Sequence, residues 1–183
     1  MVNSSLNNSN LSLGKQEQIE AFPAAVRRFD IDQFCGKWYE ISTLPWRFGK
    51  NRLSTTVTFT KNARRNFTIE ISSQKTGPNG GTITFKGNAT PHNKMYSEMK
   101  VKFLWPFSSN FWVLKVDPEY QWAVVAHPPG KRQMSIYSRS PKMEKKVYEY
   151  LVDYARSLGY EVDSMMIHIL DGHEHDTRNE GRL

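Results

Sequence analysis

Between Leu53 and Leu170 the sequence is built mainly from short segments in which apolar and polar residues alternate. A period of two residues places successive side chains on opposite faces of an extended strand. Together with a segment that opens at Gly36, the pattern predicts eight strands joined mostly by hairpin-length connections. Eight antiparallel strands in chain order close into an up-and-down β-barrel without exposed edges, and a barrel of this size can hold one small ligand.

The spacing of apolar residues changes after residue 138. Ser140-Pro141 offers a capping hydroxyl before a proline, apolar residues then recur at steps of three and four, and Gly159 follows. We therefore expect one amphipathic helix at about 141–158, packed outside the barrel. The expected organisation is a flexible polar leader at 1–20, the barrel domain with its helix at 21–170, and a polar tail at 171–183.

The 183 residues include 25 Lys and Arg against 18 Asp and Glu, a net charge of +7. The basic residues are spread along the chain rather than gathered on one stripe, so no nucleic-acid partner is expected. Peripheral contact with an anionic membrane remains open. Since residues 1–18 contain no apolar signal region, we expect a cytoplasmic or peripheral membrane protein; a periplasmic or secreted protein is the alternative if a leader was removed.

The first expected strand contains an acidic residue among aromatic ones. By parity, Trp38, Glu40 and Ser42 share one face, so an inward Trp38 brings a carboxylate inward as well. Two interpretations of Glu40 stay open. In the first, its carboxylate accepts hydrogen bonds from Tyr137 or Ser42. In the second, it anchors the polar group of a ligand.

Three motifs carry a resemblance to a known family. They are Gly36-Lys37-Trp38-Tyr39-Glu40-Ile41, then Asp117-Pro118-Glu119-Tyr120, then Tyr137-Ser138-Arg139-Ser140-Pro141. In order and spacing they resemble the lipocalin signatures, within the branch of bacterial lipocalins, apolipoprotein D and plant temperature-induced lipocalins. The resemblance covers roughly residues 22–170.

The resemblance implies a closed barrel end in which Arg139 packs over Trp38 beside Gly36, a structural arrangement. It also implies a small hydrophobic ligand, which in this branch is a fatty acid, lysophospholipid or related lipid linked to membrane maintenance. No catalytic residue, cofactor or metal is expected, and the protein is expected to be a monomer or a homodimer.

With Trp38 inward, strand parity predicts which side chains contact the ligand. They are Glu40, Ser42, Val57, Phe59, Ile69, Ile71, Phe85, Met99, Val101, Ser135 and Tyr137. Trp46 and Phe48, on the loop after the first strand, are expected at the mouth. For each apolar member, plain barrel core is the competing interpretation.

Two other functions compete with a lipid carrier. A lipocalin-fold enzyme acting on a lipid or isoprenoid would need a placed acid, and Glu40 alone qualifies. A tetrapyrrole binder is disfavoured because His127 and His168 lie near strand ends. In the tail, His173 and His175 stand among acidic residues, where a solvated stretch is favoured over a weak metal site.

Overall fold

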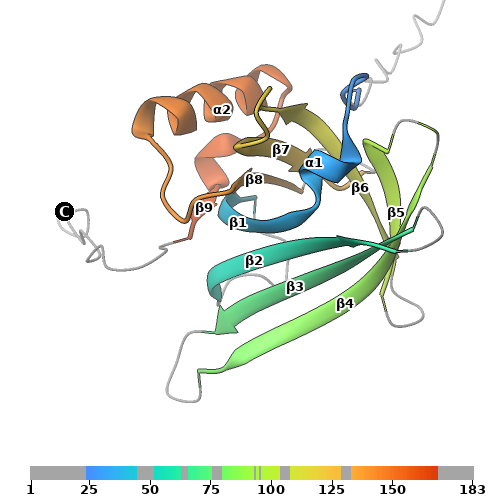
Figure 1. Ribbon diagram of the computed structural model, residues 1–183. Helices are drawn as coiled ribbons and strands as arrows, with labels where there is room; N and C mark the ends of the chain where they lie inside the picture. Colours follow the sequence, from blue (N-terminus) through green and yellow to red (C-terminus); the bar gives the residue numbers. More distant parts are fainter. Residues whose placement is uncertain are drawn as a thin grey trace, which may run out of the picture.

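The computed structural model describes residues 24–44, 52–62, 66–75, 80–92, 94, 96–103, 108–128 and 133–168. The barrel strands are β1 (Gly36–Thr43), β2 (Arg52–Lys61), β3 (Phe67–Lys75), β4 (Thr82–Pro91), β5 (Glu98–Lys102), β6 (Ser108–Val116), β7 (Trp122–Ala126) and β8 (Met134–Ser138). Each pairs antiparallel with its neighbour in the chain, and β8 returns to pair with β1 (Figure 1). The predicted eight-stranded up-and-down barrel is confirmed.

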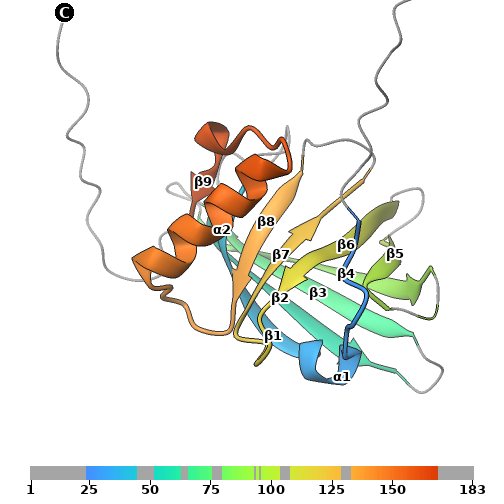
Figure 2. The same cartoon turned by 90° about the horizontal axis from the view of Figure 1, so that it is seen from above.

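The barrel has a hydrophobic layer on each side of its wall. The inner layer contains Val57, Phe59, Ile69, Met99, Val101, Val113 and Val125. The outer layer lies between the helix α2 (Lys145–Ser157) and the strands β6 to β8. Figure 2 shows α2 outside the barrel, beside β8. Leu151 and Ala155 are the fully buried residues of α2. In the described part of the chain, no helix combines the length and hydrophobicity needed to cross a bilayer.

The helix begins four residues later than its sequence predicts. Ser138 Oγ accepts a hydrogen bond from the amide of Ser140, and Ser140 Oγ accepts one from the amide of Lys142. These side chains hold the backbone in local turns, an alternative to helix that short hydroxyl residues favour. The predicted start at Ser140-Pro141 is therefore wrong, and Glu144 occupies the N-cap position.

One end of the barrel is filled by aromatic side chains. The short helix α1 (Ile31–Phe34) is capped by Asp30, whose carboxylate accepts from the amides of Asp32 and Gln33. Phe34 lies 4.8 Å from Trp38 and 5.0 Å from Phe59 between ring centroids, and Trp38 donates from Nε1 to the Phe34 carbonyl at 2.8 Å. These fully buried rings close this end, and the opposite end is called the open end below.

Strand β1 has two different neighbours along one edge. Residues Gly36–Glu40 pair with β2, whereas Ser42 and Thr43 pair with the two-residue strand β9 (Met166–Ile167) that follows the 3-10 turn η1 (Val162–Ser164). Along its other edge, β1 pairs with β8 through a bulge between Glu40 and Ser42. The segment after α2 therefore joins the barrel wall at the open end.

Candidate functional site

The inner face of the barrel is filled near the closed end and accessible near the open end. Along β4, Ala89 and Gly87 are buried, while Ile83 is partly exposed and Phe85 is 45% exposed. The register places Phe85 opposite Ile71 of β3, in the row that continues through Val57 to Trp38. Because paired residues share a face of a sheet, Phe85 lies on the inner face although solvent reaches it.

Most of the side chains predicted to contact a ligand lie in the inner layer. Val57, Phe59, Ile69, Met99, Val101 and Tyr137 belong to it, and Ile71 packs against it at its margin. Whether they touch a ligand stays a prediction. Trp46 and Phe48 lie outside the described residues.

The bulge in β1 changes the face on which Ser42 lies. Glu40 pairs with Tyr137 of the inner layer, but after the bulge Ser42 pairs with Ile136 of the outer layer. Thr43 takes the inner position instead, where its Oγ1 lies 2.8 Å from Ser135 Oγ. The prediction that Ser42 faces inward is wrong, because one extra residue in a bulge inverts the parity of everything beyond it.

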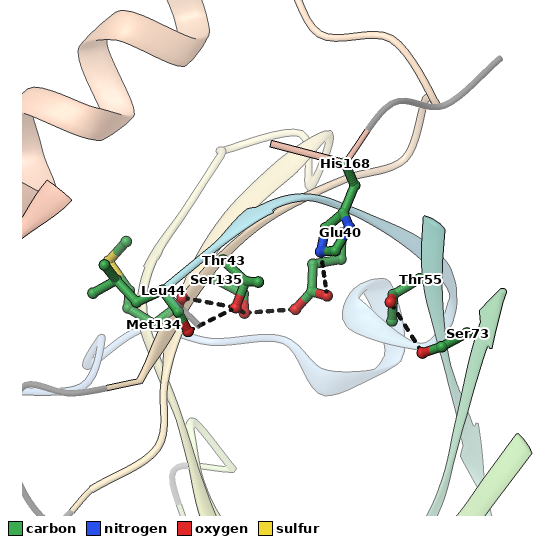
Figure 3. Close-up of polar contacts among 8 residues, drawn as sticks. All are labelled: Glu40, Thr43, Leu44, Thr55, Ser73, Met134, Ser135 and His168. Carbon is green, nitrogen blue, oxygen red and sulfur yellow. Dashed lines mark hydrogen bonds and ion pairs between the residues drawn. The ribbon is translucent and has the colours of Figure 1, made fainter. Parts of the chain in front are cut away.

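Glu40 lies in a buried polar cluster near the open end (Figure 3). Its Oε1 accepts a 2.7 Å hydrogen bond from Ser135, and its Oε2 lies 3.1 Å from Nε2 of His168. Burial acts to raise the pKa of this carboxyl, but the contacts with His168 and Ser135 outweigh it and the net pKa is lowered. The expected partners Tyr137 and Ser42 are replaced by Ser135 and His168.

His168 is the residue of this cluster that sequence reasoning missed. It follows β9, its backbone amide donates to the Ile41 carbonyl, and it is only 5% exposed. Its side chain lies against Glu40, so the position of His168 near a strand end does not count against a tetrapyrrole binder. A two-residue strand carries no periodicity, and no pattern in the sequence could have revealed this orientation.

His127, just beyond β7, is a second histidine close to the interior. Its ring lies 5.6 Å from the ring of Phe111, an inner-layer residue, and its Nδ1 is 3.0 Å from the Asn110 carbonyl. Burial lowers the pKa of His127, against the opposing effects of the Asn110 hydrogen bond and the Glu40 charge. Burial together with that charge raises the pKa of Tyr137.

Polar side chains continue from Glu40 around one side of the barrel. Glu40 pairs with Thr55 of β2, and Thr55 pairs with Ser73 of β3; the two hydroxyl oxygens lie 3.0 Å apart (Figure 3). We call Glu40, Thr43, Thr55, Ser73, Ser135 and His168 the polar arc. Across the interior, β4 and β5 present Phe85, Met99 and Val101. The polar arc is therefore one band of the interior, and the apolar side chains of the inner layer make up the remainder.

At the closed end Arg139 holds several backbone segments together. Its Cζ lies 3.8 Å from the centroid of the Trp38 ring, the contact that the resemblance implied. Its guanidinium donates to the carbonyls of Gln33, Cys35, Lys37 and Tyr120. Gly36 has a φ of +100°, and a Cβ there would lie 3.2 Å from Arg139 Nη1, so glycine suits both the backbone and the contact.

No group of metal-ligating side chains occurs among the residues whose positions the structure gives. His173 and His175 lie outside that part of the chain. Lys115 lies on the outer face, with its Nζ 4.3 Å from the Tyr154 ring and 5.1 Å from the Tyr150 ring.

Residues 29–169 match a family described as "Lipocalin-like domain". The chain belongs to the lipocalin family. Temperature-induced lipocalin-1 from Arabidopsis thaliana is 32% identical over 76% of this chain and 78% of that protein. Apolipoprotein D from Bos taurus is 28% identical over 79% of each chain. Members of the family bind small hydrophobic molecules.

The fold of this lipocalin is shared with solved structures of low sequence identity. Lobster apocrustacyanin A1 superposes with a TM-score of 0.61 at 11% identity, covering 77% of this chain and 79% of that one. At this identity the similarity concerns the barrel fold alone.

Proposed function

We propose that this lipocalin is a non-catalytic carrier of a lipid with a hydrocarbon chain, such as a fatty acid or a lysophospholipid. The observation that carries the proposal is the accessible apolar inner face near the open end, where Phe85 is 45% exposed although it lies in the row of Trp38, Val57 and Ile71. A large exposed hydrophobic residue on an inner face favours an apolar ligand that covers it.

The energy of chain burial is sufficient for useful affinity. Each methylene removed from water contributes about 0.8 kcal/mol, so about fourteen of them contribute roughly 11 kcal/mol. Lost freedom of motion on association costs at least about 4 kcal/mol. The remaining 7 kcal/mol or so corresponds to a dissociation constant of roughly micromolar order.

The polar cluster supports binding rather than catalysis. Ser135 donates its hydroxyl hydrogen to Glu40, and it is Glu40 that lies next to His168. A serine nucleophile needs a base at its own hydroxyl, and here the acceptor is a carboxylate of lowered pKa, which is a weak base. This arrangement orders the interior without activating Ser135.

A role at membranes is part of the proposal. The net charge of +7 favours approach to anionic lipid surfaces, where a carrier would collect or release its ligand. The similarity to temperature-induced lipocalin-1 favours a role in membrane maintenance under stress.

Mass spectrometry of lipids extracted from the purified protein, followed by titration with a fluorescent fatty acid, tests the carrier function. We expect a co-purified amphiphile and saturable binding that weakens in Phe85→Ser. Tyr150→Ser, which removes an exposed aromatic residue from α2, is the matched control and should bind as the wild type does. Absence of both lipid and binding contradicts the carrier, and a Soret band after addition of haem would favour a tetrapyrrole.

A further inference from the structure

The polar arc has hydrogen-bonding groups that a hydrocarbon chain cannot engage. We propose that Glu40 and His168 form a recognition site for an uncharged hydroxyl group, so that the barrel prefers long-chain alcohols and similar neutral hydroxylated lipids to free fatty acids. This inference rests on the carrier function proposed above and narrows its ligand class.

Glu40 keeps hydrogen-bonding capacity after its contacts are counted. A carboxylate offers about four lone-pair sites. Among the residues that the structure places, Ser135 donates to Oε1 and His168 approaches Oε2, which uses two of them. The Glu40 side chain is only 11% exposed, and in such surroundings an additional donor stabilises the carboxylate.

His168 supplies the complementary partner. Nε2 lies 3.1 Å from Oε2 of Glu40, and Nδ1 has no hydrogen-bond partner in the described chain. The side chain is 2% exposed, so water does not readily satisfy these nitrogens. A hydroxyl both donates and accepts, and one such group can donate to Glu40 while it accepts from an imidazole N–H.

The interior offers separate surfaces for the hydroxyl end and for the hydrocarbon chain of such a ligand. The polar arc runs along β8, β1, β2 and β3, while Phe85, Met99 and Val101 present apolar surface from β4 and β5. In this proposal the hydrocarbon chain packs on the apolar surface and directs its polar end towards Glu40, which Figure 3 shows beside Ser135 and His168.

The negative charge of Glu40 favours some ligand head groups over others. A fatty-acid carboxylate would lie next to the Glu40 carboxylate, with little water to screen the repulsion. A cationic amine would compete with His168 for Glu40 and would bring a further charge into the interior. A neutral hydroxyl avoids both costs, and for this reason we assign it to the site.

The test compares oleyl alcohol, oleate, oleylamine and methyl oleate as competitors for a neutral fluorescent dye, N-phenylnaphthylamine, bound to the full chain. At about pH 8 the oleate carboxyl is ionised. We expect oleyl alcohol to bind at least about tenfold more tightly than the other three, because a site built for a hydroxyl rejects analogues that lack it. This comparison uses the wild type and does not depend on the folding of any variant.

The variant Glu40→Gln tests whether Glu40 causes the preference for oleyl alcohol over oleate. The amide removes the charge at nearly constant shape, and we expect the ratio of oleate to alcohol affinity to rise by about tenfold. Glu70→Gln removes a carboxylate on the outer face, where Glu70 pairs with Lys86, and should leave the ratio unchanged. Equal binding of oleate and alcohol by the wild type, tighter oleylamine binding, or an unchanged ratio in Glu40→Gln overturns this inference alone. Failure of every oleyl compound to displace the dye overturns the carrier function as well.

Discussion

Replacing Arg139 with alanine should destabilise the closed end of the barrel. The guanidinium donates from Nη2 to the carbonyls of Gln33 at 2.6 Å and Cys35 at 2.9 Å. It donates from Nη1 to Lys37 at 2.9 Å and from Nε to Tyr120 at 3.3 Å. It thereby ties the segment around α1 to the turn before β7 and covers the ring of Trp38.

The magnitude follows from these contacts. Hydrogen bonds from a charged donor contribute about 1.5–3 kcal/mol each, but the carbonyls at this half-buried site can bind water when the side chain is removed. We therefore count about 2–3 kcal/mol for the four together, and about 1 kcal/mol for the cation–π contact with Trp38. Arg139→Ala should lower the free energy of unfolding by about 3–4 kcal/mol. Arg139→Lys, which keeps the charge and loses the planar fork, should lower it by about 2 kcal/mol.

Urea unfolding followed by tryptophan fluorescence and circular dichroism measures this loss. With a slope of about 2 kcal/mol per molar, the midpoint of Arg139→Ala should fall by about 1.5–2 M. Arg156→Ala is the control, because Arg156 pairs with Asp153 and Asp163 at the exposed surface and should contribute less than about 1 kcal/mol. A loss below about 1 kcal/mol in Arg139→Ala would refute the structural role assigned to this residue.

Three further variants test other parts of the barrel. Gly36→Ala should lose about 2 kcal/mol of stability in the same assay, because alanine is strained at a φ of +100°; no loss would contradict the assigned conformation. Phe59→Ala should cost about 3–5 kcal/mol, since this 1% exposed ring contacts Phe34 and Phe111, and a smaller cost would mean that the inner layer collapses around the gap. His127 has a folded-state pKa below its unfolded value of 6.5, so its neutral form contributes stability above about pH 6.5 that is lost as the pH falls towards the folded pKa. His127→Gln should therefore lose less stability than the wild type between about pH 7.5 and pH 5, and parallel losses in the two proteins would exclude this histidine as the cause.

Strand parity predicted the barrel because most of its ladders are regular. The row of Trp38, Val57, Ile71 and Phe85 could be read from the sequence, since antiparallel partners without bulges keep their faces. The same reasoning failed at Ser42, where a bulge between Glu40 and Ser42 inverts the faces. Nothing in the local composition distinguishes that position from a regular strand.

The candidate site was only partly predictable for a different reason. Glu40 could be singled out, because an inward carboxylate is unusual in any core. Its partner His168 lies more than a hundred residues away, beyond α2, and is positioned by a strand of two residues. Such a contact depends on how the segment after the helix returns to the barrel, which short-range patterns do not encode.

The position of β9 in the barrel wall also has a consequence for truncated chains and for protein synthesis. The edge of β1 at Ser42 and Thr43 is paired by β9, whereas β2 covers only Gly36–Glu40. A ribosome-bound chain that ends before Met166 would leave this part of the edge open to pairing with other chains, a common route to aggregation. The edge of β1 at the open end is therefore paired only after β9 is synthesised, although β1 itself is synthesised early.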